Sequence, residues 1–268
     1  MAPGSSRGLR LLASALLMAF SLAFLLPLLW TLRSALLPEG LAYALPPVFG
    51  PLTLENFRQV LLGPLGRGFL NSLLVASWVV LLGLPLAAGL GYALARYRFG
   101  GHPLRFAVLA TQMLPPIVLA LPLFALLRAL GLSGSLKAMV LAHLAFALPF
   151  MAWLLMGFFQ GFPRELEEAA LVDGATPWQA FLRVTLPLLL PVLWVLLILQ
   201  VVAEARTYDL VYVLTRGGPG TATDLVSFYI YRQAFLGLDL SGASAMGYLL
   251  LLGTLALTAL YYRGLTRT

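Results

Sequence analysis

Long apolar blocks, separated by shorter polar segments, make up most of the chain. Several blocks reach or exceed the roughly 20 residues that a helix needs to cross the hydrocarbon core of a bilayer. The pattern predicts membrane-spanning helices at about 11–37, 69–95, 104–130, 136–160, 184–208 and 243–262. We therefore predict an all-α polytopic membrane protein with six transmembrane helices, in a single transmembrane domain over residues 1–268.

The first two predicted spans carry further information. The first is too long for the core of a signal peptide and lacks a small-residue cleavage site, so we expect an uncleaved anchor. The second contains Gly83, Gly89 and Gly91, together with Ala87 and Ala88. Small residues on a transmembrane helix favour close packing against a neighbouring helix.

Composition agrees with a membrane protein. Hydrophobic residues make up 61% of the chain and charged residues 10%, whereas an ordinary soluble domain has about 25% charged residues. The chain has no cysteine, which excludes disulfides and thiolate metal sites.

The net charge of +7 is explained by the orientation of the spans in the membrane, so we expect membrane lipids and no nucleic acid as partners. Arg96, Arg98 and Arg105 crowd one very short loop between predicted spans. Positive loops face the cytoplasm. We therefore expect both termini and the loop 161–187 to be cytoplasmic, and loops 38–68 and 209–242 to face outward.

The loop 161–187 is unusually polar and predicts two short helices. The first begins near Pro163 and has Glu165, Glu167 and Glu168 in its first turns, where the helix dipole favours anions. The glycine of Asp173-Gly174 can supply the left-handed conformation that ends a helix. The first helix is therefore expected to end there.

Thr176-Pro177-Trp178-Gln179 predicts the start of the second helix, with Thr176 and Gln179 forming a capping box. Ala169 and Ala170 have almost no side chain, so another surface can approach the first helix closely. Three interpretations follow from these residues alone: a docking surface for a partner, a structural lid, or a surface helix solvated on one side.

The spacing within this loop resembles a known family. Glu168-Ala169-Ala170, three residues, Gly174, nine residues and Val184-Thr185-Leu186-Pro187 are similar to the "EAA…G…I-x-L-P" loop of binding-protein-dependent ABC importer permeases. The departure from that pattern is valine in place of isoleucine at 184.

The resemblance implies a type I ABC importer permease fold whose cytoplasmic coupling helix, between spans four and five, contacts an ATPase. It assigns that interface to Glu168, Ala169, Ala170, Asp173 and Gly174. The chain has no P-loop pattern around Lys137. We therefore expect no catalytic residue, metal site or cofactor in this chain, with ATP and Mg bound by a dimer of cytoplasmic ABC ATPase subunits.

Further segments resemble the maltose-type carbohydrate permeases, and specifically the shorter of their two paired subunits. These segments are "PLTLENFRQVL" (51–61), "FLNSLLVA" (69–76), "YALARYRFGG" (92–101) and "TQMLPPIVLALPLF" (111–124). Residues 208–235 depart from it and read more like the longer subunit. The resemblance implies a sugar substrate, an extracytoplasmic sugar-binding protein and a second permease subunit in a heterodimer. It also implies the plasma membrane of a bacterium or archaeon.

Polar side chains inside spans indicate functional positions because they are costly in a bilayer. We select Gln112 and Glu204, with the nearby aromatic Tyr208, as candidate residues of the substrate pathway. A structural hydrogen bond between spans is an equally good interpretation for each. His143 is interpreted as a packed, hydrogen-bonded histidine, and His102 as a loop residue.

Three alternatives remain at this point. The same importer class could carry a polyol, a glycerol-phosphate, an amino acid or another small solute. An ion-coupled secondary transporter often has midplane carboxylates, for which Glu204 alone gives thin support. A polytopic membrane enzyme would need a convergent catalytic set, which the sequence does not show.

Overall fold

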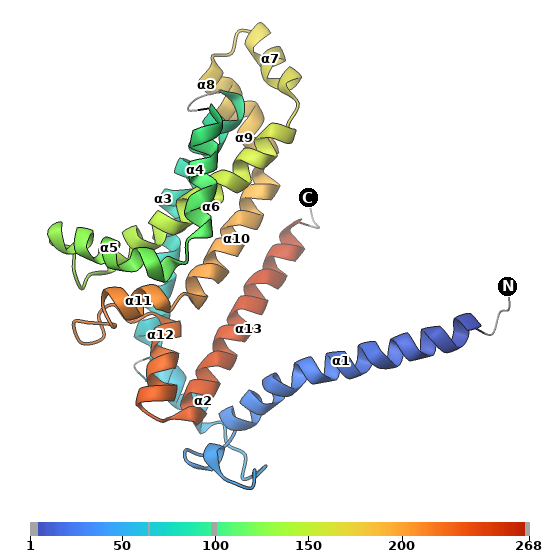
Figure 1. The fold of residues 1–268 in the computed structure, drawn as a ribbon, viewed down its shortest axis with the longest axis vertical. Coiled ribbons are helices and arrows are strands. Elements are labelled where there is room, and N and C mark those ends of the chain that lie inside the picture. Colours follow the sequence, from blue (N-terminus) through green and yellow to red (C-terminus); the bar gives the residue numbers. More distant parts are fainter. Residues whose placement is uncertain (1–4, 64, 98–100, 266–268) are drawn as a thin grey trace. The chain divides into compact units, whose positions relative to one another are not determined.

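The computed structural model describes residues 5–63, 65–97 and 101–265, and over these residues it is all-helical (Figure 1). This confirms the predicted fold class. It comprises two compact units, residues 1–63 with 230–252 and residues 64–229 with 253–268. The helices are α1 (Ser5–Ala35), η1 (Leu41–Tyr43), α2 (Glu55–Leu62), α3 (Leu65–Arg96), α4 (Gly101–Met113), α5 (Pro116–Ala129), α6 (Leu136–Gly161), α7 (Arg164–Val172), α8 (Pro177–Ala180), η2 (Phe181–Thr185), α9 (Leu186–Leu188), α10 (Leu190–Arg206), α11 (Asp209–Leu214), α12 (Val226–Tyr231), η3 (Arg232–Leu236) and α13 (Leu240–Leu265).

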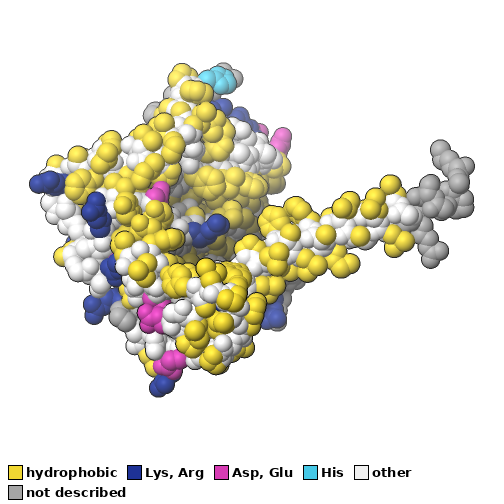
Figure 2. Space-filling view, turned by 60° about the horizontal axis from the view of Figure 1, so that its bottom comes forward, with side chains coloured by type: hydrophobic (Ala, Val, Ile, Leu, Met, Phe, Trp, Pro, Cys, Tyr) yellow, Lys and Arg dark blue, Asp and Glu magenta, His cyan; other side chains and the backbone are white. Residues whose placement is uncertain are grey.

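Within the described residues, four helical segments are long and apolar enough to cross a membrane: Gly8–Ala35, Gly66–Arg96, Leu136–Gly161 and Leu240–Leu260. Two bent helix pairs also qualify, which brings the number to six if each pair is one span. Hydrophobic side chains cover most of the surface in Figure 2, with charged groups at scattered places. Such a surface suits hydrocarbon rather than water.

The two bends lie within the spans expected at 104–130 and 184–208 and were not predicted from the sequence. Helices α4 and α5 meet at 101° around Leu114-Pro115-Pro116. A residue before proline is driven out of the α conformation, and proline cannot donate a backbone hydrogen bond. The segments Pro177–Leu188 and Leu190–Arg206 meet at 69°. The π-helical turn η2 lies just before this second bend.

In the unit of residues 1–63 and 230–252, α1 is exposed from Gly8 to Thr31. Its C-terminal end is fixed by α2: Asn56 Nδ2 donates to the carbonyl oxygens of Ala35 at 2.8 Å and Leu37 at 2.7 Å. A helix end leaves such carbonyls without partners. The "LENF" segment of the sequence therefore closes the end of α1.

In the other unit, the most extensive packing is between α3 and α6. Gly91 is required for it, since a Cβ there would lie 2.9 Å from the carbonyl oxygen of Ala152 and 3.0 Å from the backbone nitrogen of Met156. A Cβ at Gly89 would meet nothing within 4 Å. Of the glycines predicted to allow close packing, Gly83 and Gly91 lie against α6, since a Cβ at Gly83 would lie 2.6 Å from Met151 Cε, whereas Gly89 does not.

Candidate functional site

Helix α7 and the turn after it form as their local sequence predicts. Gly174 has φ +88°, and its N–H donates to Leu171 O while that of Ala175 donates to Ala170 O. These two bonds form a Schellman motif, which satisfies the last carbonyls of a helix. At α8, Thr176 and Gln179 form the complete capping box. The predicted pair of short helices is confirmed.

The residues predicted to contact an ATPase lie on the surface of this helix pair. Glu168, Ala169, Asp173 and Gly174 are exposed, and Ala170 is half-buried. Large apolar side chains surround them and are exposed as well: Leu166, Leu171, Val172 and Trp178. Glu168 forms no ion pair with Arg164 within the described residues. This mixed acidic and apolar face is therefore open to a partner.

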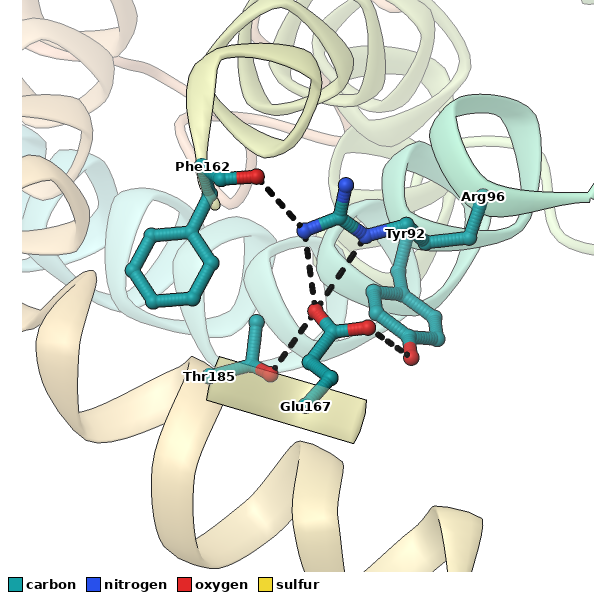
Figure 3. Close-up of polar contacts among 5 residues, drawn as sticks. All are labelled: Tyr92, Arg96, Phe162, Glu167 and Thr185. Atoms are coloured by element: carbon teal, nitrogen blue, oxygen red, sulfur yellow. Dashed lines mark hydrogen bonds and ion pairs between the residues drawn. The ribbon is translucent and has the colours of Figure 1, made fainter. Parts of the chain in front are cut away.

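The side chain of Glu167, unlike that of the exposed Glu168, is buried and points into the protein (Figure 3). Its Oε1 accepts hydrogen bonds from Arg96 Nε at 3.2 Å, Arg96 Nη2 at 3.0 Å and Thr185 Oγ1 at 3.0 Å. Its Oε2 accepts one from the hydroxyl of Tyr92 at 3.1 Å. Arg96 Nη2 also donates to Phe162 O at 3.1 Å. We call Tyr92, Arg96, Glu167 and Thr185 the Arg96 cluster.

Aromatic rings cover the Arg96 cluster on one side. The ring centroid of Tyr92 lies 4.7 Å from that of Phe181 and 5.4 Å from that of Phe159. The ring of Trp178 stacks on that of Phe181, with 5.6 Å between their centroids. Only 7% of the Arg96 side chain and 12% of that of Glu167 are exposed. Low local dielectric strengthens hydrogen bonds among groups that are fully partnered. The cluster therefore holds α3, α7 and η2 together firmly.

The local sequence did not predict this arrangement. The three glutamates were interpreted through the helix dipole, and Arg96 through membrane orientation alone. The available signal was the three- and four-residue spacing of helices: in α7, Glu167 shares a face with Ala170 rather than with Glu168. The neighbouring Arg98 lies outside the described residues.

A second polar feature is a cleft of about 200 Å³ between α4, α5, α6, α10 and α11. We call it the interhelical cleft. Polar and aromatic side chains share its wall with small apolar ones. Its lining residues are Gln112, Pro116, His143, Phe146, Ala147, Phe150, Gln200, Ala203, Glu204, Thr207, Asp209 and Leu210.

Glu204 and His143 meet at this cleft. Glu204 Oε1 accepts a hydrogen bond from Gln200 Nε2 at 2.5 Å, and Oε2 lies 3.2 Å from His143 Nδ1. The latter contact lacks hydrogen-bond geometry, so Oε2 and both nitrogens of His143 are buried without a hydrogen-bond partner among the described residues. Such groups are costly to bury. His143 is packed in the interior, as interpreted from the sequence, but the hydrogen bond expected for it is not formed among the described residues.

Of the other two residues predicted for the substrate pathway, Gln112 lines the cleft and Tyr208 does not. Gln112 lines it together with Glu204, and its Nε2 donates to Phe146 O at 3.4 Å. Tyr208 is not part of the lining, although its neighbours Thr207 and Asp209 are. The structure brings Gln112 and Glu204 to one place and leaves Tyr208 beside it.

The polar residues at the start of α3 form hydrogen bonds with the loop before α12 and with the start of α12. Asn71 Nδ2 donates to the carbonyl oxygens of Ala222 and Asp224, and Ser72 Oγ accepts from Val226 N. Ser72 thus accepts a hydrogen bond from the first backbone N–H of α12. Asn71 and Ser72 hold the 215–224 loop against α3.

The chain also resembles known proteins. Residues 80–266 match the model of the family "binding-protein-dependent transport system inner membrane component". The diacetylchitobiose uptake system permease protein NgcG of Streptomyces coelicolor is 35% identical over 71% of this chain. The trehalose transport system permease protein SugB of Mycobacterium tuberculosis is 36% identical over 62% of this chain. The chain spans 64% and 62% of the lengths of these relatives, less than two thirds of each.

A solved bacterial ABC transporter involved in the import of the polysaccharide alginate has the same fold. It superposes on this chain with a TM-score of 0.73 at 19% sequence identity, and covers 97% of this chain and 98% of its own. The family match covers well over half of the residues, and the all-helical fold agrees with it. The chain therefore belongs to the family of inner membrane components of binding-protein-dependent transport systems.

Proposed function

We propose that this chain is a permease subunit of an ATP-driven importer that moves a sugar delivered by an extracytoplasmic binding protein. Two similar proteins are named for diacetylchitobiose and trehalose transport. The observation that carries the proposal is the open face of α7, where Glu168, Ala169, Asp173 and Gly174 are exposed while Glu167 fastens the helix from behind.

In this proposal α7 is the coupling helix. A dimer of cytoplasmic ABC ATPase subunits binds ATP and Mg and supplies the energy. The small side chains of Ala169 and Ala170 let the ATPase surface approach the helix backbone, and Glu168 offers it a carboxylate. Both chain termini are then cytoplasmic, a second permease subunit completes the membrane pathway, and this chain itself hydrolyses nothing.

The interhelical cleft supports a sugar as the solute. Phe146 and Phe150 present aromatic faces for the C–H surfaces of a sugar, and Gln112, His143 and Glu204 present hydrogen-bonding groups for its hydroxyls. The cleft is smaller than the roughly 300–1,000 Å³ of a complete ligand pocket. It is therefore suited to one half of a pathway that a second subunit completes.

The charge of the cleft favours a neutral solute over a phosphate ester. Its lining includes Glu204 and Asp209 but no lysine or arginine. Phosphate esters are bound most strongly through charge-assisted bonds from arginine or lysine. A glycerol-phosphate would therefore meet carboxylates without a compensating cation.

The proposal is tested by purifying the chain with its ATPase, sister subunit and binding protein, and by measuring ATP hydrolysis and uptake in proteoliposomes. Trehalose and diacetylchitobiose are the first sugars to screen. We expect a loaded binding protein to stimulate hydrolysis and uptake. Glu168→Lys and Gly174→Asp should abolish uptake and weaken ATPase association while membrane insertion persists.

The matched control is Glu165→Gln, an exposed acidic residue on the same helix. Gly174→Ala separates strain in the turn from loss of partner contact, because any side chain at φ +88° strains the backbone while a Cβ there meets nothing within 4 Å of its own chain. A loss of ATPase association in Gly174→Asp but not in Gly174→Ala points to the partner surface. Full association and uptake in both Glu168→Lys and Gly174→Asp would refute the coupling assignment.

A further inference from the structure

The adjacent residues Glu167 and Glu168 are assigned to opposite tasks by the turn of α7. Glu168 faces outward, where a partner can reach it. Glu167 faces the body of its own unit and accepts four hydrogen bonds from three side chains, two of them from the guanidinium of Arg96. Arg96 is 71 residues away in sequence, at the end of α3.

We propose that Arg96 is a positioning residue that fastens α7 to α3, so that displacement of α7 by a partner moves α3 with it. This rests on the proposed function, in which an ATPase acts on α7. It assigns to Arg96 and Glu167 a task in energy coupling that is separate from partner contact. Helix α7 also packs on α8 and η2, which follow it in the chain, whereas its hydrogen bonds to α3 come from Arg96 and Tyr92.

The geometry of Arg96 favours fastening over simple charge neutralisation. Nε and Nη2 both donate to Glu167 Oε1. Nη2 also donates to the carbonyl oxygen of Phe162, which lies in the short connection between α6 and α7. The planar guanidinium can make these bonds at once from one rotamer, whereas the ammonium of lysine is a point charge on a flexible stem. Arg96 thus ties α3 to α7 and to the start of the loop.

The remaining partners extend the attachment. Thr185 brings η2 to the same carboxylate, and Tyr92 adds a second contact from α3, one turn before Arg96. Further along, α3 packs on α6 through the close approach at Gly91. Helix α6 carries His143 of the interhelical cleft. Motion of α7 would therefore be delivered to helices that form the cleft.

The test uses the importer complex with its ATPase, sister subunit and binding protein in proteoliposomes. ATP hydrolysis and uptake of radiolabelled trehalose, or of diacetylchitobiose if the first screen selects it, are measured in the same vesicles. In Arg96→Lys and Glu167→Gln we expect ATP hydrolysis to continue and sugar moved per ATP to fall at least about fivefold, the lower end of typical allosteric coupling.

Two nearby substitutions serve as controls. Arg105→Lys changes an arginine whose Nη2 donates to Leu94 O of α3 without contacting α7. Glu165→Gln changes an exposed carboxylate of α7. Both should keep the wild-type ratio of uptake to hydrolysis. Arg96→Lys and Glu167→Gln complexes that assemble and also keep that ratio would overturn the proposal.

Milder variants cover the case in which these substitutions prevent assembly. Tyr92→Phe and Thr185→Val each remove one hydrogen bond and leave the Arg96–Glu167 ion pair in place. We expect each to lower sugar moved per ATP by a smaller factor than Arg96→Lys. Unchanged ratios in both, together with failed assembly of the first pair, would assign the cluster to stability alone and overturn the proposal.

A distance measurement tests the attachment directly. The chain has no cysteine, so nitroxides can be attached at Leu86→Cys on α3 and Glu165→Cys on α7, which are both exposed. We expect the pulsed-EPR distance distribution to be the same with and without ATP in the otherwise native chain, and to shift or broaden with ATP in Arg96→Lys. A distance that changes equally in both backgrounds would contradict the proposal.

The two proposals fail in distinguishable ways. If the native chain shows no ATPase association and no binding-protein-dependent uptake, the proposed function is wrong. If the native complex transports sugar and the Arg96 variants behave like the controls, only the positioning task of Arg96 is wrong.

Discussion

Glu167 and Glu204 are both buried carboxylates of the same unit, yet their oxygens are partnered very differently. Glu167 accepts hydrogen bonds on both oxygens and pairs with a guanidinium. Glu204 accepts one from Gln200 on Oε1, while Oε2 faces His143 without hydrogen-bond geometry. A fully partnered network specifies one arrangement, whereas a partly satisfied one retains capacity for another partner.

The difference matches what each place would have to do in an importer. The Arg96 cluster joins segments that must move together, and changing its partners would release them. The interhelical cleft must bind a solute and let it go, so hydrogen-bonding capacity left open by the protein is useful there. The contrast can be tested through the free energy of unfolding, and the following substitutions run from the largest expected loss to the smallest.

Arg96→Ala should give the largest loss. It leaves Glu167 buried without its cation, and removing one partner of a buried ion pair costs about 3–5 kcal/mol. The loss is measured by denaturant unfolding of the purified complex, with Arg105→Ala as the control. A loss below about 1 kcal/mol would show that Glu167 is easily resolvated, and the contrast with Glu204 would then weaken.

Gly91→Leu tests the helix packing that lies between the two features. Its side chain would have to enter the space occupied by the backbone of Ala152 and Met156, and overpacking costs about 1–3 kcal/mol. Gly89→Leu is the matched control on the same helix, since a Cβ there meets nothing within 4 Å. Equal melting temperatures for the two variants would contradict the close approach of α3 and α6.

Thr185→Val isolates one hydrogen bond of the Arg96 cluster. The hydroxyl of Thr185 is completely buried and donates to Glu167 Oε1 at 3.0 Å. Losing one such bond should lower the free energy of unfolding by about 1 kcal/mol. Thr258→Val, at an exposed position where the hydroxyl donates to Thr254 O, is the control. A loss no greater than that of the control would show that the remaining donors suffice for Glu167.

Glu204→Gln should give the smallest loss, below the roughly 1 kcal/mol of one hydrogen bond. The amide keeps an oxygen for Gln200 and places an NH₂ group where Oε2 lacked a hydrogen bond. Uptake should suffer, with the KM for the sugar rising about tenfold or more, because a hydrogen bond to a charged group contributes about 1.5–3 kcal/mol.

The same exchange at Glu167 provides the comparison. Glu167→Gln removes the charge that Arg96 pairs with, so it should destabilise the complex more than Glu204→Gln does. Equal losses at the two positions would mean that the two carboxylates are equally well partnered. An unchanged KM in Glu204→Gln would remove Glu204 from the solute pathway.

Structural elements that are specified by nearby residues could be predicted well from the sequence. The bounds of α7, the left-handed Gly174 and the capping box of Thr176 and Gln179 depend on residues within one or two turns of each other. The apolar blocks gave the helical membrane fold for a similar reason, since span length depends on bilayer thickness. The bend between α4 and α5 also had a local cause in Pro115 and Pro116, but apolar continuity concealed it.

The residues of the candidate sites could be predicted from the sequence only in part. Gln112 and Glu204 were selected because polar groups are rare inside spans, and they do line one cleft. The position of His143 at the cleft was not predicted, because it depends on the contact of its imidazole with Glu204, which lies 61 residues later in the chain. No local pattern encodes that meeting, which depends on how α6 and α10 pack.

The sequence by itself determined the helical membrane architecture, the two capped helices of the 161–187 loop and the family resemblance. All of these depend on short-range chemistry or on spacing. Only the tertiary structure decided which of two adjacent glutamates faces the protein and which faces a partner. The one-residue difference is a rotation of about 100° on a helix, and its meaning depends on Arg96, Tyr92 and Thr185 arriving from distant segments.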